Sequence, residues 1–251
     1  MKAVSLISAL IIVIPLLSQT RSSHDNHRKR LFRHHGTNVW SCNSADVNAF
    51  VFESGLAIDA DGAFSAYHPN NRLGLDSIEN AGRPGDWWAL ATDSGKPSGH
   101  PVLQGKDDPA PGYYVSMTSL FDADISNEHD PRRFVDAARI PYVVLPPKGF
   151  KHAKLGDFAM VINLHNRKMS GAIVADESAP DLPMGESSIA LARTLGIDSN
   201  PRTGGASNSV AYVVYPRSGN GKPRTLKEIA SLSRSHFQMW GGLTKLNGCL
   251  R

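Results

Sequence analysis

Short apolar runs separated by turn-forming residues make up most of the chain after residue 40. The runs are four to seven residues long and lie between clusters of Gly, Pro, Asn and Asp, a pattern typical of strands joined by turns. Many short strands with few helices favour a mainly β fold in a single domain, either a barrel or a sandwich. The predicted strands are residues 49–52, 63–67, 87–91, 113–117, 142–145, 158–164, 172–175 and 210–215.

Two segments have helical rather than strand spacing. The first helix is predicted to open at Glu186, because apolar side chains recur at helical intervals up to Leu195 and Gly196 supplies a stop signal. The second is predicted to begin at Thr225, where Glu228 three residues later completes a capping-box sequence.

The first 20 residues have the pattern of a secretory signal peptide. Lys2 gives a positive start, residues 3–17 are almost wholly apolar, and residues 18–20 offer a small-x-small cleavage pattern. The alternative is an uncleaved membrane anchor, for which the apolar stretch is short. Residues 21–38 are polar and basic and are expected to form a disordered leader ahead of one domain over residues 39–251. We therefore expect a secreted protein, extracellular or periplasmic, with no membrane contact after signal removal.

Composition and charge narrow the function classes. With 22 Gly, 16 Pro and 2 Cys in 251 residues, the chain is not collagen-like, disordered or a disulfide scaffold. Residues 53–136 hold fourteen Asp and Glu against six Lys and Arg, a net charge of −8, whereas residues 137–251 hold fifteen Lys and Arg against seven Asp and Glu, a net charge of +8. An acidic wall can attract a cationic substrate, although the two halves can also simply attract each other. No nucleic-acid partner is expected.

The two cysteines lie near the ends of the expected domain. An even cysteine count in an exported chain favours a bridge between Cys42 and Cys249. The alternative is a pair of buried free thiols. No spacing of Cys or His residues has the pattern of a zinc site.

Asp176 and Glu186 are the candidates for catalysis. A buried-looking strand ends at Asp176, a Pro-containing loop follows, and Glu186 stands at the expected helix start. A glycosidase needs one carboxyl group to protonate the leaving oxygen and another to activate water or attack the sugar. As pattern alone, an Asp after a strand and a Glu at a helix start are more often structural residues.

Other chemistries lack their signals in this sequence. We find no GxSxG elbow, no HExxH, no GxxxxGK[ST] and no GxGxxG after a strand, which argues against the corresponding acyl-transfer, zinc-protease and nucleotide-dependent classes. The His residues share no ligand spacing. We expect neither a metal nor an organic cofactor.

Residues 174–197, VADESAPDLPMGESSIALARTLGI, resemble the active-site segment of glycoside hydrolase family 75, the fungal-type chitosanases and their bacterial relatives. Weaker similarities to the bacterial branch extend the resemblance to roughly residues 50–216. Two departures from the fungal pattern are Ala60 in place of a Cys and a shorter loop between the two carboxylates. The weaker blocks are AIDADG at 57–62, YHP at 67–69, AGRPGDWW at 81–88, PGYYVS at 111–116 and IPYVVLP at 140–146.

The resemblance implies an endo-acting hydrolase of the β-1,4-glucosaminidic bonds of chitosan that inverts the anomeric carbon. Glu186 would be the general acid and Asp176 the general base. By analogy we also expect a closed or partly closed barrel, six-stranded and double-psi-like, in a monomer. A general acid needs a raised pKa, whereas a helix start favours the ionised form. Burial, or the charge of Asp176 or Glu177, would therefore have to oppose the helix dipole at Glu186.

Chitosan is a polycation at mildly acidic pH, so its cleft should present carboxylates and aromatic faces. Asp59, Asp61 and Asp86 are expected to contact ammonium groups, although the first two also suit a tight turn. Tyr67, Trp87 and Tyr113 are the main candidates for sugar stacking, with Trp88 and Tyr114 beside them. If Trp87 and Trp88 lie in a strand, they point to opposite faces, and only one of them can line a cleft.

Two other functions stay open at this point. The same carboxylate pair could serve a hydrolase or lyase acting on peptidoglycan or partly acetylated chitin. A non-catalytic domain that binds extracellular polysaccharide is the non-enzymatic alternative, which would bind polymer and release no reducing ends.

Overall fold

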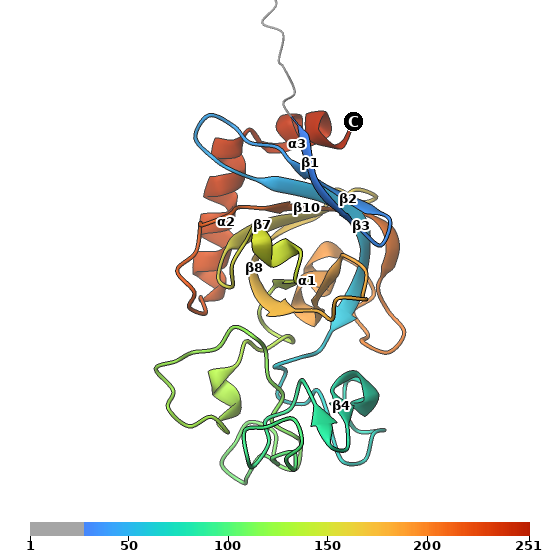
Figure 1. Cartoon of the computed structure of the whole chain (residues 1–251), viewed down its shortest axis with the longest axis vertical. Helices are drawn as coiled ribbons and strands as arrows, with labels where there is room; N and C mark the ends of the chain where they lie inside the picture. Colours follow the sequence, from blue (N-terminus) through green and yellow to red (C-terminus); the bar gives the residue numbers. More distant parts are fainter. Residues whose placement is uncertain (1–27) are drawn as a thin grey trace, which may run out of the picture.

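The structure, a computed structural model, describes residues 28–251 (Figure 1). The predicted signal peptide and the first part of the predicted leader lie outside the described residues. In the described part, no helix has the length and apolar character needed to cross a membrane.

Six strands form a closed β-barrel. The strand order is β3 (Phe50–Asp59), β10 (Ala206–Val214), β7 (Phe158–Asn163), β8 (Met169–Glu177), β6 (Tyr142–Leu145) and β9 (Glu186–Ser188), and β9 pairs back onto β3. The β3–β9 and β6–β8 pairs are parallel, and the remaining pairs are antiparallel. The expectation of a single, mainly β domain with a closed six-stranded barrel is therefore confirmed.

Alternating residues of the barrel strands enter two apolar cores. In β7, Phe158, Met160 and Ile162 belong to one core, and Ala159 and Val161 belong to the other. The first core also contains side chains of α2 (Leu226–Trp240), which stands along one side of the barrel (Figure 1). The second contains side chains of α1 (Ile189–Leu195). Burial on both faces explains why this strand is a continuous apolar run in the sequence.

A hairpin extends the barrel sheet at its N-terminal edge. It consists of β1 (Lys29–His34) and β2 (Thr37–Ser41), and β2 pairs with β3. The disordered leader predicted over residues 21–38 is thus wrong for its described part. Leu31 and Phe32 pack against the second core, so this short basic strand buries more apolar surface than its charge suggests.

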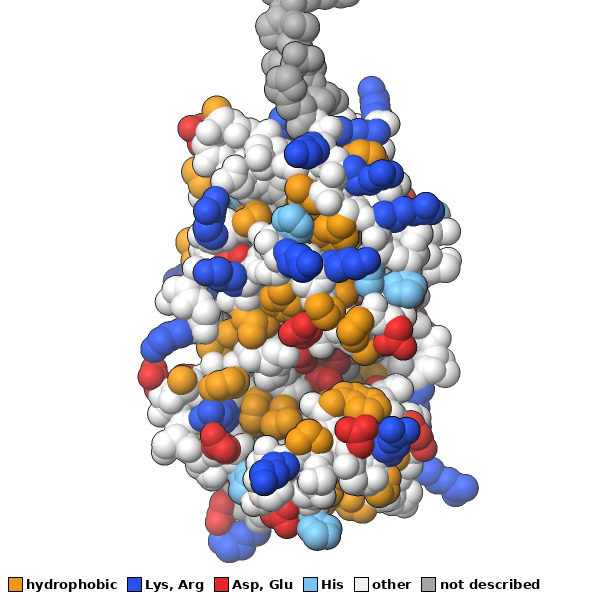
Figure 2. Space-filling view, in the orientation of Figure 1, with side chains coloured by type: hydrophobic (Ala, Val, Ile, Leu, Met, Phe, Trp, Pro, Cys, Tyr) orange, Lys and Arg blue, Asp and Glu red, His pale blue; other side chains and the backbone are white. Residues whose placement is uncertain are grey.

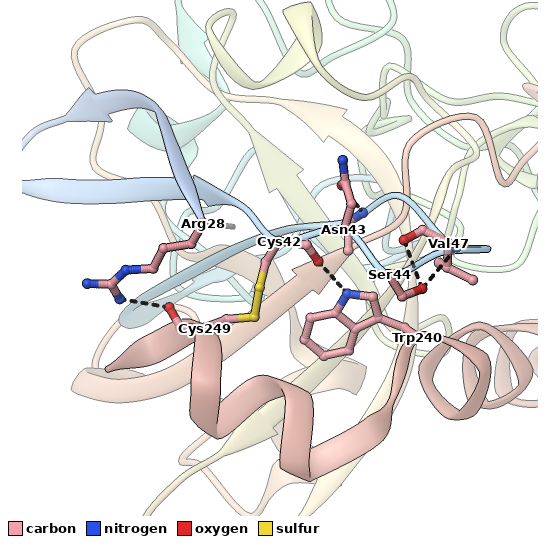
Figure 3. The surroundings of a disulfide bond; sticks show 8 residues. Arg28, Cys42, Asn43, Ser44, Val47, Trp240 and Cys249 are labelled. Carbon is pink, nitrogen blue, oxygen red and sulfur yellow. Dashed lines mark hydrogen bonds between the residues drawn. A yellow bond between two sulfur atoms is a disulfide. The ribbon is translucent and has the colours of Figure 1, made fainter. Parts of the chain in front are cut away.

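The disulfide between Cys42 and Cys249 is present, as predicted (Figure 3). It joins the end of β2 to α3 (Gly242–Leu250). The indole nitrogen of Trp240 donates a hydrogen bond to the carbonyl oxygen of Cys42. The C-terminal helices are therefore held against the start of the barrel by a covalent bond and by buried packing.

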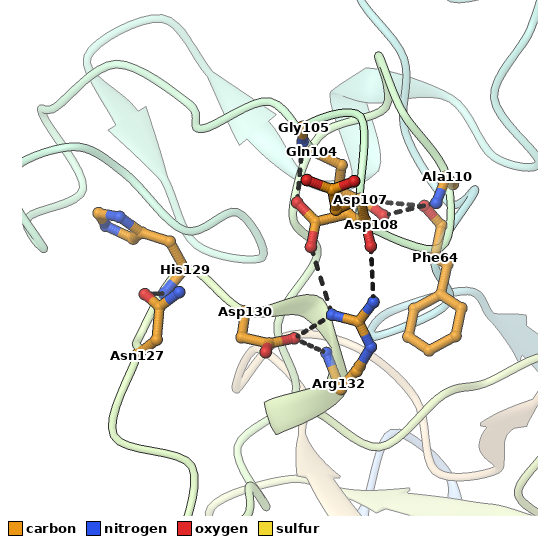
Figure 4. Close-up of polar contacts among 10 residues, drawn as sticks. All are labelled: Phe64, Gln104, Gly105, Asp107, Asp108, Ala110, Asn127, His129, Asp130 and Arg132. Atoms are coloured by element: carbon orange, nitrogen blue, oxygen red, sulfur yellow. Dashed lines mark hydrogen bonds and ion pairs between the residues drawn. The ribbon is translucent and has the colours of Figure 1, made fainter.

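Residues 60–141 form a loop layer over one end of the barrel (cyan to green in Figure 1). Its regular elements are short: η1 (Ile78–Asn80), β4 (Gly82–Arg83), β5 (Asp86–Trp87) and η2 (Pro131–Arg133). A further short helix, η3 (Gly149–Lys151), follows β6. Polar contacts hold the layer together: the Arg132 guanidinium pairs with Asp108 and Asp130 (Figure 4).

The loop layer contains three predicted strands that do not form as such. Residues 63–67 make successive turns, in which the amide of Ala66 donates to the carbonyl of Ala63. Residues 87–91 and 113–117 are linked mainly by an isolated bridge between Leu90 and Ser116. The second of these two runs also has an isolated bridge between Leu103 and Tyr114, and its turn-forming neighbours Pro111 and Gly112 keep it from extending into a regular strand.

Candidate active site

Three barrel strands bring carboxyl groups to the end of the barrel that the loop layer covers. Asp59 is the last residue of β3, Asp176 is the second-last residue of β8, and Glu186 is the first residue of β9. In the parallel β3–β9 pair, Ala57 is opposite Glu186 and Asp59 is opposite Ser188. Because side chains alternate along a strand, Asp59 and Glu186 face the same side of the sheet.

Asp59, Asp61 and Asp176 form a close cluster. Their nearest carboxylate oxygens all lie within 4.8 Å of one another, although Asp59 and Asp176 are 117 residues apart in the chain. Asp59 and Asp176 are buried, and Asp61 and Glu186 are half-buried. Figure 2 shows a hollow between the barrel and the loop layer with acidic side chains at its floor. Three carboxylate oxygens this close together can share a proton or a cation.

Three hydrogen-bond donors hold the Asp176 carboxylate. Its Oδ1 accepts from the Ser119 hydroxyl at 2.5 Å, the Ser119 amide at 3.1 Å and the Glu177 amide at 2.8 Å. Ser119 belongs to the loop layer. The amide of the next residue, Leu120, donates to the carbonyl oxygen of Ala175 in β8. The loop layer thus orients a barrel carboxylate.

Two tyrosine hydroxyl groups donate hydrogen bonds to Asp61. The Tyr67 hydroxyl donates to Oδ1 of Asp61 at 2.6 Å, and the Tyr142 hydroxyl donates to the Asp61 carbonyl oxygen at 3.0 Å. The Asp61 amide in turn donates to Oδ1 of Asp59 at 2.7 Å. These contacts fix the DxDG turn against the barrel.

Burial raises the pKa of every carboxyl group in the site. It raises the pKa of Asp59 to about 6. Burial and then the charge of Asp59 raise the pKa of Asp176 to about 7. Burial, followed by the charges of Asp59 and Asp176, raises the pKa of Glu186 to about 8. Asp61 has a pKa well above its ordinary value, first through burial and then through the charge of Asp59.

The structure corrects the predicted setting of Glu186. This residue lies in strand β9, and α1 begins three residues later at Ile189, with Ser188 as the N-cap. The expected conflict with the helix dipole is therefore weak, because that field falls off within the first turn. The predicted remedies, burial and the charge of Asp176, do act on Glu186, together with Asp59 and Asp76.

The predicted stacking residues have mixed positions. Tyr67 is 1% exposed, so its ring offers no face to a sugar, contrary to prediction, and its hydroxyl donates to the Asp61 carboxylate instead. Trp87 is half-buried against the core, whereas Trp88 is 58% exposed. The exposed member of this pair is therefore Trp88, and not Trp87, which was the main candidate. Tyr113 is half-buried and packs edge-on against His68, with ring centroids 4.8 Å apart.

Asp86 does not join the carboxylate cluster in the described structure. It is exposed in β5 and pairs with Arg83 at 3.4 Å. Its neighbour in sequence, Trp87, is what anchors that hairpin to the core.

Sequence reasoning missed Ser119, Tyr142 and Asp76. Ser119 lies 57 residues before Asp176, in a loop without a motif. Tyr142 was assigned only to a strand. Asp76 is buried and adds negative charge at Glu186. A signal existed for Tyr142 alone, since a buried tyrosine hydroxyl usually finds a polar partner.

The arrangement can hold one carboxyl group protonated beside another that is ionised, in a hollow open to solvent. Such a pair can donate a proton to a leaving group and accept one from water. A family model described as fungal chitosanase of glycosyl hydrolase group 75 matches residues 114–241. No curated protein matches the chain. The matched range contains both Asp176 and Glu186.

Proposed function

The chain belongs to glycoside hydrolase family 75, and from this premise we propose that it cleaves the β-1,4-glucosaminidic bonds of chitosan internally, with inversion, using Glu186 as general acid and Asp176 as general base. The observation that carries the proposal is the unequal hydrogen bonding of the two carboxyl groups. Asp176 accepts three donors, which favour its ionised form. Within residues 28–251, no donor contacts the carboxyl group of Glu186, and its pKa is raised to about 8.

In the proposed reaction, Glu186 donates its proton to the glycosidic oxygen as the bond to the anomeric carbon breaks. Asp176 accepts a proton from a water molecule, whose oxygen attacks the anomeric carbon from the opposite face. One β-glycosidic bond and one water are consumed, and the new reducing end has the α configuration. Glu186 is left ionised and Asp176 protonated, so a proton must pass between them, through solvent, before the next cycle.

The acidic floor of the hollow supports a substrate with amino groups. Asp59 and Asp61 lie beside Asp176, so a sugar bound there meets several carboxylates. An ammonium group on that sugar would be attracted by these charges, whereas an acetamido group would not. We therefore expect cleavage to increase as the polymer loses acetyl groups.

The test is a reducing-end assay on chitosan of graded acetylation and on chitin. We expect Glu186→Gln and Asp176→Asn to lose at least about a thousandfold in kcat, because each removes an acid–base group. Asp181→Asn, in the exposed loop between the two residues, is the matched control and should retain wild-type turnover. Thermal unfolding checks that all three variants fold.

Near-normal turnover in Glu186→Gln would refute the assignment of the acid. A β-configured first product, seen by NMR before mutarotation, would refute inversion. Faster cleavage of fully acetylated chitin than of chitosan would refute chitosan as the preferred substrate and would favour another amino-sugar polymer.

Secretion is part of the proposal. It is supported by the apolar N-terminal pattern and by the Cys42–Cys249 disulfide, which suits an oxidising compartment. N-terminal sequencing of protein recovered outside the cell should begin close to residue 21. An intact Met1 would refute cleavage. The monomeric state stays a prediction that size-exclusion chromatography with light scattering can test.

A further inference from the structure

A second polar hollow lies on the barrel, away from the carboxylates. It has a volume of about 240 Å³ and is lined in part by Ser41, Asn43, Asn48, His152 and Arg217, and we call it the Arg217 pocket. The pocket includes Phe50, the first residue of β3, whereas Asp59 is the last residue of that ten-residue strand. At about 3.3 Å per residue, the two sites are separated by about 30 Å.

The backbone of Arg217 is held in an uncommon conformation. Its φ is +61°, in the left-handed region that favours glycine. The Arg217 amide donates to Oδ2 of Asp157 at 3.0 Å, and the Lys154 amide donates to the same oxygen at 2.8 Å. Oδ1 of Asp157 accepts from the Gly219 amide at 3.0 Å. Asp157 is 1% exposed, so a buried carboxylate fixes the two segments that carry these cations.

The Arg217 side chain, the one Lys or Arg that lines this pocket, has no acidic partner in the described structure. Within residues 28–251, the side chain of Arg217 makes no ion pair, nor do those of Lys154 and Lys151, which do not line the pocket but belong to the segment before β7, whereas several basic residues of the loop layer are paired. No Asp or Glu lines the pocket. His152 stacks on Phe32 of β1 with ring centroids 5.5 Å apart, which brings the basic strand β1 to the same place. In the view of Figure 2, Lys and Arg side chains are spread over the barrel half of the molecule.

We propose that the Arg217 pocket binds an anionic group of an acidic polysaccharide, at a site separate from the catalytic hollow. A guanidinium group pairs with sulfate, phosphate or carboxylate through two parallel hydrogen bonds. The amide and hydroxyl groups of Asn43, Asn48 and Ser41 suit the hydroxyl groups of a sugar unit. A polysaccharide is favoured over a lipid surface because the pocket is concave and offers several polar side chains to one bound unit.

Arg217→Gly is the decisive variant. Glycine adopts a φ of +61° without strain, so the midpoint of thermal unfolding should stay the same or rise although the guanidinium group is lost. Arg167→Gly is a matched control, because Arg167 is also an exposed arginine with a φ of +65° and makes no ion pair within residues 28–251. It lies in the β7–β8 turn, at the far end of β7 from Asp157.

The probe is a fluorescein-labelled heparin hexasaccharide, titrated into the full chain at low and at physiological salt, with maltohexaose as the uncharged comparison. We expect Arg217→Gly to weaken heparin binding about tenfold, Arg167→Gly to leave it within about twofold, and maltohexaose to bind at least about tenfold more weakly than heparin. Cleavage of short glucosamine oligomers should be unchanged in both variants, so this inference and the proposed hydrolase function can fail separately.

Equal losses in the two arginine variants would mean a diffuse charge effect and would overturn the proposal. So would unchanged heparin binding in Arg217→Gly. Vesicles containing anionic lipid provide the remaining comparison: if Arg217→Gly weakened vesicle binding and not heparin binding, a membrane surface would replace the polysaccharide as the partner.

Discussion

Asp59 acts electrostatically on each of the other three carboxyl groups of the site. Its charge raises the pKa of Asp61, Asp176 and Glu186. It lies on the same sheet face as Glu186 and within 4.8 Å of Asp176, measured between carboxylate oxygens. After burial, the charge of Asp59 is therefore the largest cause of the raised pKa of both proposed catalytic groups.

Replacing Asp59 by Asn should move the activity towards lower pH. Loss of its negative charge lowers the pKa of Asp176 from about 7 and that of Glu186 from about 8. The proposed mechanism needs Asp176 ionised and Glu186 protonated, so both limbs of the pH profile of kcat/KM should shift to the acidic side. Asp86→Asn removes an exposed charge and should leave the profile in place. An alkaline shift in Asp59→Asn would contradict this account.

Replacing Ser119 by Ala should move only the acidic limb of the pH profile of kcat/KM, and should move it to higher pH. The Ser119 hydroxyl donates to Asp176 at 2.5 Å and so favours the ionised carboxylate. Without it, the pKa of Asp176 rises and the acidic limb of the profile moves to higher pH, while the alkaline limb, set by Glu186, stays. Ser126→Ala, at an exposed position of the loop layer, is the comparison. Equal movement of both limbs would mean a general rearrangement.

At the element scale, local patterns predicted the elements that carry their own signals. The run at residues 142–145 is β6, and the run at 158–164 contains β7. The capping box at Thr225 and Glu228 does begin α2. By contrast, β9 is three residues long and exists because it pairs with β3, which lies more than 120 residues earlier. Such pairing leaves no periodicity to detect, so Glu186 was assigned to the helix that follows.

Thr225→Ala should destabilise the fold through α2 alone. The Thr225 side chain accepts from the Glu228 amide, and the Glu228 carboxylate accepts from the Thr225 amide. Loss of a helix cap costs about 1 kcal/mol in the free energy of unfolding, which urea denaturation measures. Thr244→Ala, inside the exposed part of α3, removes the same hydroxyl and should cost less. Turnover should be unaffected, because α2 packs on the barrel side.

At the scale of the whole molecule, the disulfide should be a major source of stability. It closes a loop of 207 residues, for which the chain-entropy model gives about 5 kcal/mol as an upper value. We expect the double variant Cys42→Ala with Cys249→Ala to lose about 2–5 kcal/mol of unfolding free energy. Reduction of the wild type should have the same effect. A loss below about 1 kcal/mol would mean that packing around Trp240 alone holds the C-terminal helices.

The buried carboxyl groups should make stability fall as the pH rises. Their folded-state pKa values, about 6 for Asp59, about 7 for Asp176 and about 8 for Glu186, lie above the unfolded values. The folded state therefore binds more protons, and their contribution is fully present below about pH 4 and is lost as the pH rises through about 6 to about 8. Urea midpoints across this range should decline, and less steeply in Asp176→Asn with Glu186→Gln. A slope unchanged in that double variant would refute the raised values.

Barrel closure has a consequence for the order in which the protein matures. When residues 1–185 have been synthesised, Asp59 and Asp176 already exist, but the strand that bears Glu186 does not, and β10 is still to come. A barrel that lacks β9 and β10 does not contain Glu186, and the loop layer alone does not contain Asp59, Asp176 or Glu186. The proposed site is thus complete only once β9 and β10, the last two barrel strands in the chain, have joined the barrel.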